Sequence, residues 1–509
     1  MIRGQETAVY IGQMITELSL EGFRSFRDRQ QINFAPLTFI YGPNSAGKSS
    51  IIKSLLLLQQ SVQFSSTSFP VFGGPLVDLG SVWDTVHGHQ ANGMTRISIV
   101  LDADSSISRS TTGESNLFTK ARVEFGLSID GHQDDSLEVE LFNSEGRSLI
   151  LAFSRCGDDL GMWALRPETL QSYLELGNLF GDFRPEELFP TTNTNLLPVF
   201  SNDSLLPGHV YGHLDGTIRS SYGSSISPTD LFWNRLATDL VRQFRSEMGK
   251  ISYLGPLRKP WERTEKVSTV EHMQVVGSIG ENSLSLLKSR PELLAQVNTS
   301  LSNTLECGYR LHLNSAQFTV DGPDRRQIVA PTIMPTLEHL ISGVHVSPVD
   351  AGFGLSQLLP IVVEMHLRER STILIEQPEL HLHPRLQARM GQLLRNAVSG
   401  RNQNRFIIET HSEHLILRIR RLIRQNLISP DMVQILYVNN QEVDGENLSQ
   451  PLTTTLHSHV LSLRLDSHGD FIDPWPNGFF DERFEELDTW GEDVTESLDV
   501  TGGFGTLEV

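Results

Sequence analysis

The segment that most constrains this chain lies near its N-terminus, where residues 42–49 read GPNSAGKS and fit the pattern G-x-x-x-x-G-K-[ST]. Residues 37–41 before it are an apolar, β-type run, and residues 50–60 after it carry apolar positions at helical spacing. Strand, glycine loop and helix in this order aim backbone N–H groups at phosphate oxygens. We therefore predict a phosphate-binding loop. Its residues are Gly42, Pro43, Asn44, Ser45, Ala46, Gly47, Lys48, Ser49 and Ser50.

The composition is that of an ordinary globular protein long enough for two to four domains. The chain has 509 residues, of which 39% are hydrophobic and 20% charged. It shows no apolar run of membrane-spanning length and no signal peptide, and its two cysteines, Cys156 and Cys307, lack metal-type spacing. We therefore expect a cytoplasmic protein without a membrane partner.

The net charge of −20 argues against a protein that coats nucleic acid with its whole surface, but it allows a local basic patch. Arg420, Arg421 and Arg424 share one face of a predicted helix and could bind DNA phosphates or an acidic segment. Arg258 and Lys259 are further candidates near the nucleotide or a DNA channel. The residues from 481 onward are strongly acidic. A solvated tail is the favoured interpretation, and docking on a basic partner is the alternative.

The secondary-structure pattern predicts an α/β protein in four parts. Residues 14–155 form an N-terminal lobe with a hairpin at 14–34, the phosphate loop, and an antiparallel meander of strands at 95–101, 121–129, 136–142 and 148–154. Residues 156–335 form an insert of mixed helices and loops, with helices at 167–179 and 228–250 and loops at 190–195 and 216–227. Residues 336–445 alternate helix and strand, and residues 446–509 form a small C-terminal cap with the acidic tail.

A second set of candidate residues follows the strands of this C-terminal lobe. The strand at 372–376 ends in Glu376, which precedes Gln377 and Glu379, and the strand at 405–410 delivers His411. Because the carboxyl ends of parallel strands carry ligand-binding loops, these side chains are candidates for a catalytic centre. Upstream, Gly354 opens a helix whose first turn carries Ser356 and Gln357, which predicts a further anion-binding helix end.

Several of these motifs together resemble ATPase heads of the ATP-binding-cassette type, in the branch that holds SMC and recombination-repair ATPases and the overcoming-lysogenization-defect family. The motifs are Gly22-Phe23-Arg24-Ser25-Phe26, Gly354-Leu355-Ser356-Gln357, residues 376–384 (EQPELHLHP) and Thr410-His411-Ser412. The segments at 253–258 and 475–480 resemble a prokaryotic subgroup related to ATPases of anti-phage systems such as Septu. The resemblance covers about half of the chain and omits the insert. It implies a head with a P-loop, an antiparallel β subdomain, a mixed insert and a small cap.

The resemblance also implies a mechanism. Two heads would sandwich two ATP molecules, so that the P-loop of one copy faces Ser356 and its neighbours Gly354 and Gln357 in the other. Mg²⁺ would be held by Ser49 and Glu376. The catalytic residues would be Glu376, Gln377, Glu379 and His411. Gln377 replaces the second acid usual in the family, and glutamine can orient water but cannot accept its proton. This leaves Glu379 as base, slow hydrolysis, or proton transfer to phosphate as alternatives.

The resulting hypothesis is an ATP-hydrolysing homodimer or higher oligomer that controls a separate effector, such as a nuclease, in bacterial anti-phage defence, with DNA as a further candidate partner. The alternatives are an ATP-dependent scaffold that sequesters a toxic partner, and a DNA-repair ATPase. No Toprim-type acid pair follows residue 438, so nuclease activity is not expected from this chain alone.

Overall fold

The computed structural model describes fifteen stretches of the chain. They are residues 15–64, 70–89, 93–102, 119–128, 136–142, 148–155, 162–165, 196–201, 210–213, 218–220, 243–266, 275–321, 327–352, 354–441 and 457–476.

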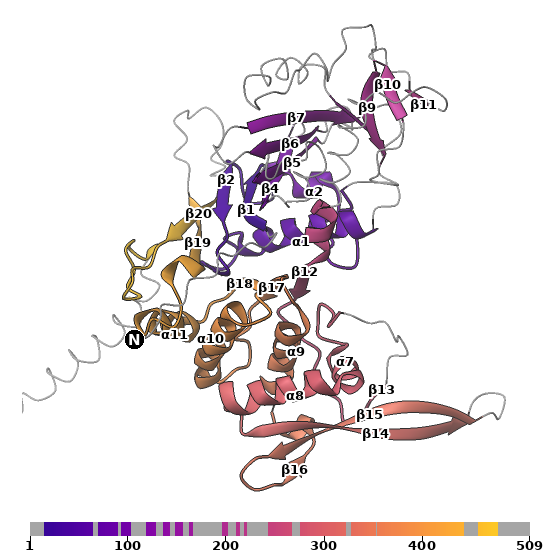
Figure 1. Ribbon diagram of the computed structural model, residues 1–509, viewed down its shortest axis with the longest axis vertical. Helices are drawn as coiled ribbons and strands as arrows, with labels where there is room; N and C mark the ends of the chain where they lie inside the picture. Colours follow the sequence, from indigo (N-terminus) through magenta and orange to yellow (C-terminus); the bar gives the residue numbers. More distant parts are fainter. Residues whose placement is uncertain are drawn as a thin grey trace, which may run out of the picture.

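A six-stranded sheet forms the centre of the molecule (Figure 1). Its first five strands are parallel and the last is antiparallel to its neighbour. In spatial order they are β12 (Ile251–Leu254), β17 (Thr372–Glu376), β18 (Arg405–Glu409), β3 (Leu37–Tyr41), β19 (Val433–Gln441) and β20 (His457–Leu463). The strand that ends at Glu409, β18, therefore lies between β17 and β3, and β3 comes from the other end of the chain.

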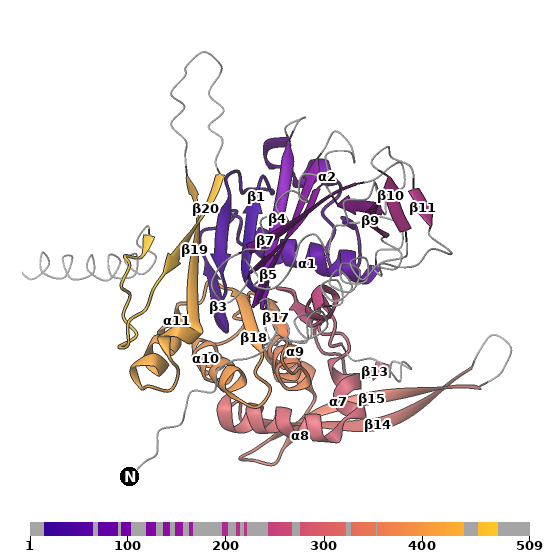
Figure 2. The ribbon, with the colours of Figure 1, turned by 45° about the horizontal axis from the view of Figure 1, so that its top comes forward.

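Helices cover both faces of this sheet because its strands are apolar on both sides. On β3, Ile40 belongs to one hydrophobic core, whereas Phe39 and Tyr41 belong to the other. The first core holds α1 (Lys48–Phe64), which lies between the central sheet and the antiparallel sheet in Figures 1 and 2. Burial from two sides explains why nearly all of α1 is inaccessible to solvent.

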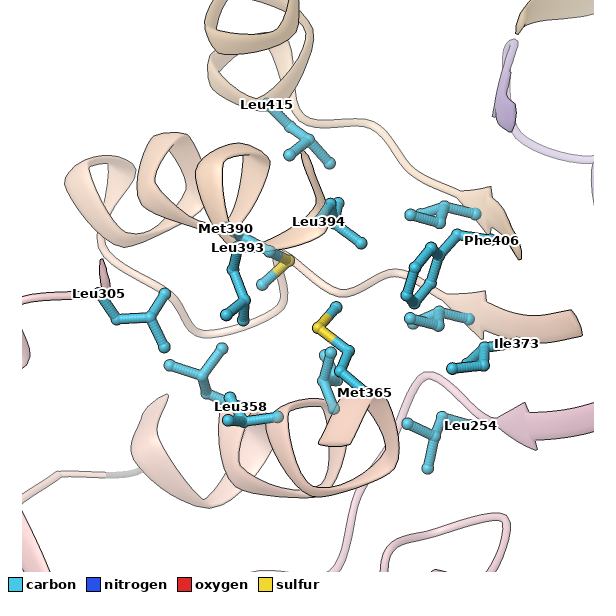
Figure 3. Close-up of a cluster of buried hydrophobic side chains, with 14 of the residues drawn as sticks. Leu254, Leu305, Leu358, Met365, Ile373, Met390, Leu393, Leu394, Phe406 and Leu415 are labelled. Carbon is cyan, nitrogen blue, oxygen red and sulfur yellow. The ribbon is translucent and has the colours of Figure 1, made fainter. Parts of the chain in front are cut away.

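The second core lies under α9 (Gly354–Leu367), α10 (Pro384–Ser399) and α11 (Glu413–Arg424). Figure 3 shows how these helices meet the sheet: Met365 of α9 points into the space that Phe406 and Ile373 of the strands also enter, whereas Leu358 lies nearer Leu305. Local signals set the helix ends. Pro384 occupies the first turn of α10, and the Ser412 side chain accepts a hydrogen bond from the Leu415 N–H at the start of α11 (3.1 Å).

A ten-stranded antiparallel sheet covers the other side of α1. Its strands with described side chains are β1 (Ile15–Glu21), β2 (Gln30–Asn33), β4 (Met94–Asp102), β5 (Lys120–Ser128) and β6 (Ser136–Phe142). It continues through β7 (Ser148–Arg155), β8 (Met162–Leu165), β9 (Leu196–Ser201), β10 (Val210–His213) and β11 (Ile218–Ser220). The short α2 (Val82–Thr85) and η1 (His87–His89) lie between α1 and β4 in sequence.

A third unit packs against α9 and carries a long two-stranded ribbon that projects from the body (Figure 1). Its strands β14 (Tyr309–Asp321) and β15 (Gln327–His339) pair antiparallel over their full length. The unit's remaining elements are β13 (Glu265–Lys266), α7 (Ser283–Ser289), α8 (Pro291–Thr299), η3 (Ser300–Thr304), β16 (His345–Val346) and η4 (Pro348–Asp350). The short η5 (Pro430–Met432) precedes β19.

The structure confirms the α/β class, the N-terminal hairpin, the meander of β4 to β7 and the alternating helices and strands of the C-terminal lobe. The loop expected at 216–227 is wrong in part, because Ile218–Ser220 pairs with β10. The helix expected at 167–179 and the loop at 190–195 lie outside the described residues. Of the helix expected at 228–250 only residues 243–250 are described, and 243–249 of these are helix. The four domain boundaries stay predictions. Among the described helices, none combines the length and apolarity needed to cross a bilayer.

Candidate functional site

The glycine loop between β3 and α1 forms the floor of a cavity of about 530 Å³, a size typical of small-molecule sites. Of the predicted loop residues, six line this cavity: Asn44, Ser45, Gly47, Lys48, Ser49 and Ser50. The loop requires glycine at two positions. Gly42 has φ +142°, and a Cβ there would lie 2.0 Å from the carbonyl oxygen of Val438. At Gly47 (φ +99°), a Cβ would lie 2.3 Å from the Ser25 hydroxyl.

The remaining loop residues support its shape from within. Pro43 and Gly42 offer their carbonyl oxygens to the Lys48 ammonium group, at 2.8 and 3.1 Å. Ala46 is fully buried, and its carbonyl oxygen accepts a hydrogen bond from the Ser458 hydroxyl of β20 (2.6 Å). The loop is therefore fixed by a strand that lies more than 400 residues downstream in the sequence.

Residues from the N-terminal hairpin and from α2 and η1 form a second side of the cavity. They are Arg24, Ser25, Asp84, Val86, Gly88 and His89. The hydroxyl oxygen of Ser25 is buried next to Gly47 and has no hydrogen-bond partner among the described residues. An unpaired buried hydroxyl beside a glycine loop fits a phosphate ligand, which would accept its hydrogen bond.

The carboxyl ends of β17 and β18 supply the third side. Gln377, Glu409 and His411 all line the cavity. The Ser49 hydroxyl donates to Glu409, with its oxygen 2.9 and 3.1 Å from the two carboxylate oxygens. Gln377 has φ +44°, and its backbone N–H donates to the carbonyl oxygen of Glu409 (2.7 Å). The cavity therefore joins the predicted Lys48, Ser49, Gln377 and His411 in one site.

Two predicted acids lie beside this cavity rather than in its lining. Glu376 accepts a hydrogen bond from the Tyr253 hydroxyl (3.0 Å). Both oxygens of Glu379 are occupied, one by the Thr410 hydroxyl (2.6 Å) and the other by the backbone N–H of His411 (2.7 Å). Glu379 thus braces the loop that carries His411.

The predicted anion-binding residues of α9 are also outside the cavity lining. Ser356 is 3% exposed and Gln357 is fully buried. Gln357 pairs with the backbone of Arg258, accepting from its N–H (3.1 Å) and donating to its carbonyl oxygen (2.9 Å). Gly354 packs so closely that a Cβ would lie 2.8 Å from the carbonyl oxygen of His381. The role of these three residues toward a second copy stays a prediction.

Arg258 is a buried structural link, 2% exposed. Its guanidinium group donates to the carbonyl oxygens of Glu376 (2.7 Å) and Gln377 (3.3 Å). Burial lowers the pKa of Arg258 to about 10. Lys259 instead pairs with Glu265 (3.4 Å). Of the predicted basic stripe, Arg420 and Arg424 both pair with Asp470, at 2.7 and 2.9 Å.

Burial dominates the electrostatics of the site. It raises the pKa of Glu409, Glu376 and Glu379, and the charges of Glu376 and Glu409 also repel each other. It lowers the pKa of Lys48, although the charge of Glu409 partly opposes this. It also lowers the pKa of His411, with a further contribution from the charge of Lys48. Partly desolvated charges of this kind interact strongly with an ionic ligand.

Sequence reasoning missed Glu409 as a site residue. The strand at 405–410 was predicted, and the carboxyl ends of parallel strands share one edge, so a glutamate before Thr410 was a usable signal. Arg24 and Ser25 entered only through a resemblance of motifs, and the structure brings both to the cavity wall.

Comparison with protein families supports the two halves of this site. A model described as an AAA ATPase domain matches residues 267–416, and a model described as an AAA domain matches residues 17–58. The first includes Gln377, Glu409 and His411, and the second includes the glycine loop. Comparison with curated proteins gives no match.

Among solved structures, the chain is similar to heads of SMC proteins. A head bound to the C-winged helix domain of ScpA is 13% identical, with a TM-score of 0.38 and coverage of 89% of this chain and 98% of that one. The SMC head domain from Thermotoga maritima is 13% identical, with a TM-score of 0.33 and coverage of 89% and 99%. A head from Pyrococcus furiosus is 12% identical, with a TM-score of 0.37 and coverage of 95% and 100%.

Proposed function

We propose that this chain binds a magnesium–ATP complex in the cavity above its glycine loop, hydrolyses the ATP slowly, and pairs with a second copy while ATP is bound. The main support is that three separate segments of the chain line one cavity. They contribute Lys48, Ser49, Gln377, Glu409 and His411. The matches to AAA ATPase domain models at both halves of the site support the same proposal.

The roles follow from which residues line the cavity. Lys48 and the loop N–H groups would neutralise and hold the phosphates, and His411 would face the terminal phosphate. Mg²⁺ held at Ser49 would neutralise charge on the β and γ phosphates. Gln377 orients water but cannot take its proton, and both oxygens of Glu379 already accept hydrogen bonds. Hydrolysis is therefore slow, so the ATP-bound form of the protein persists until the ATP is cleaved.

Pairing of two copies is the second part of the proposal. A terminal phosphate held by two surfaces gives the paired state an affinity that ADP cannot supply. In this arrangement the amino end of α9, with Gly354 and Ser356, faces the nucleotide of the other copy. The test is the molar mass in solution, measured by light scattering after size exclusion.

The wild-type protein should double its mass with ATP and return to the single mass with ADP. Lys48→Ala should stay single with both. A wild-type mass that does not respond to ATP would contradict pairing, and nucleotide binding would remain a separate question.

We also propose that the ATP-bound pair controls a separate effector, such as a nuclease, in anti-phage defence. Support comes from the resemblance of motifs to ATPases of anti-phage systems. The glutamine at 377 favours one alternative, a scaffold that holds a toxic partner with little turnover. Co-purification separates these: a bound nuclease supports both, and its release on ATP depletion favours the scaffold. DNA-stimulated turnover without any partner would favour a repair ATPase and contradict effector control.

A further inference from the structure

The carboxylate closest to the glycine loop belongs to β18 rather than to β17. We infer that Glu409, together with Ser49, forms the Mg²⁺ site of this protein, and that Glu376 does not bind the ion. The inference rests on the proposed function, because it assigns the metal-binding carboxylate of that same site.

The first support is direct contact. The Ser49 hydroxyl lies 2.9 and 3.1 Å from the two oxygens of Glu409. In a P-loop the hydroxyl that follows the lysine is the one that faces Mg²⁺. A carboxylate in contact with that hydroxyl would be placed to hold the same ion. Mg²⁺ is commonly held by one or two carboxylates together with phosphate oxygens and water.

The second support is the register of the sheet. Glu409 on β18 is paired in register with Ile40 on β3. On its other side, Glu409 is paired with Glu376 on β17. Neighbouring strands lie about 4.8 Å apart. Glu409 is therefore one strand away from the strand that leads into the glycine loop, whereas Glu376 is two strands away.

The third support is that the other acids near the site already accept hydrogen bonds from the protein. Glu376 accepts from Tyr253, which comes from β12 on the side of β17 away from the loop. Glu379 is occupied by Thr410 and His411. Among the described residues that line the cavity, the carboxylates are Glu409 and Asp84. Asp84 belongs to α2 and already accepts hydrogen bonds from the backbone and side chain of Ser81.

The fourth support is charge. Glu409 is 5% exposed, and the cations that act on its carboxylate are Lys48 and Lys53. Lys48 is also the group that would neutralise nucleotide phosphates, so it would be shared between two anions. A divalent cation at Ser49 would supply additional positive charge to Glu409 and the phosphates. It would also reduce the repulsion between Glu409 and Glu376.

The test measures metal affinity, not turnover. Mn²⁺ replaces Mg²⁺ and is titrated by electron paramagnetic resonance in the presence of a non-hydrolysable ATP analogue. We expect Glu409→Gln and Ser49→Ala to weaken Mn²⁺ binding by about tenfold or more. Glu376→Gln should stay within about threefold of the wild type. The matched control is Glu369→Gln at an exposed position, which should equal the wild type.

Folding is checked by binding of the analogue in excess EDTA, which Glu409→Gln should retain. A loss of Mn²⁺ affinity in Glu376→Gln that equals or exceeds that in Glu409→Gln would overturn the inference. A wild-type protein that binds Mn²⁺ and analogue, with Glu409→Gln unchanged, would overturn the inference alone. A wild-type protein that binds no analogue would overturn the proposed function as well.

Discussion

Gln357 and Arg258 are joined by a pair of hydrogen bonds that links the start of α9 to the loop after β12. The Gln357 amide accepts from the Arg258 backbone N–H at 3.1 Å and donates to its carbonyl oxygen at 2.9 Å. The Arg258 guanidinium group in turn holds the carbonyl oxygens of Glu376 and Gln377. The segment proposed to face a second copy is thus connected to the residue proposed to orient water.

Replacing Gln357 tests this link. Gln357→Leu keeps the volume but leaves a buried N–H and a buried carbonyl oxygen of Arg258 without partners. We expect a loss of about 2–4 kcal/mol in the free energy of unfolding, measured by urea denaturation. Gln392→Leu on α10, whose hydrogen bond to Asn396 is exposed, should cost less than about 0.5 kcal/mol. Equal losses in the two variants would show that the hydrogen bonds of Gln357 stabilise the fold no more than an exposed pair does.

The glycine loop makes a second prediction. Gly42→Ala would place a Cβ 2.0 Å from the Val438 carbonyl oxygen at φ +142°. Because backbone must move to relieve this contact, we expect a loss of about 3 kcal/mol or more and loss of nucleotide binding. Gly249→Ala is the control, since a Cβ there has nothing within 4 Å. Wild-type stability in Gly42→Ala would show that the loop has a different shape.

How much the sequence predicts depends on how local the signal is. The glycine loop and the strand 37–41 combine a motif with a continuous apolar run, and both lie where predicted. The contact between Ser49 and Glu409 spans 360 residues, so it depends on the strand order, which no local pattern states. The same holds for Gln357. Its place at a helix start suggested an anion site, whereas tertiary packing buries it against Arg258.

The ribbon of β14 and β15 was missed for a different reason. Residues 309–321 alternate in part, but no motif lies around them, and the pattern of the insert predicts only helices and loops. Their pairing over 13 residues on each strand depends on register, which the structure alone supplies.

Replacing the buried acid Glu409 is predicted to stabilise the protein, by an amount that depends on pH. Burial raises the pKa of Glu409 above that of the unfolded chain, so the ionised form costs stability once the pH exceeds the unfolded value. Glu409→Gln should therefore melt a few degrees higher than the wild type at pH 7.5 without ligand. The difference should shrink as the pH falls toward about 4.3, the ordinary pKa of glutamic acid. A variant that melts lower than the wild type at pH 7.5 would contradict this.

Position 377 predicts a gain in catalysis. Gln377→Glu places a proton acceptor where the cavity holds an amide, so we expect single-turnover ATP hydrolysis to rise by about tenfold or more. Glu379→Gln removes a brace of His411 rather than a base, and should leave the pH dependence of the rate unchanged even if the rate falls. Rapid-quench assays measure both. A rate that does not respond to Gln377→Glu would place the attacking water elsewhere.

The proposed function requires that a nucleotide occupies the cavity above the glycine loop and is held by Lys48. Equilibrium binding of labelled ATP to the wild type and to Lys48→Ala, with Mg²⁺ present, measures this. We expect one saturable site per chain in the wild type and a loss of affinity of about a hundredfold or more in the variant, equal to about 2.7 kcal/mol or more. Equal affinity in the two proteins, or no saturable binding to the wild type, would contradict it.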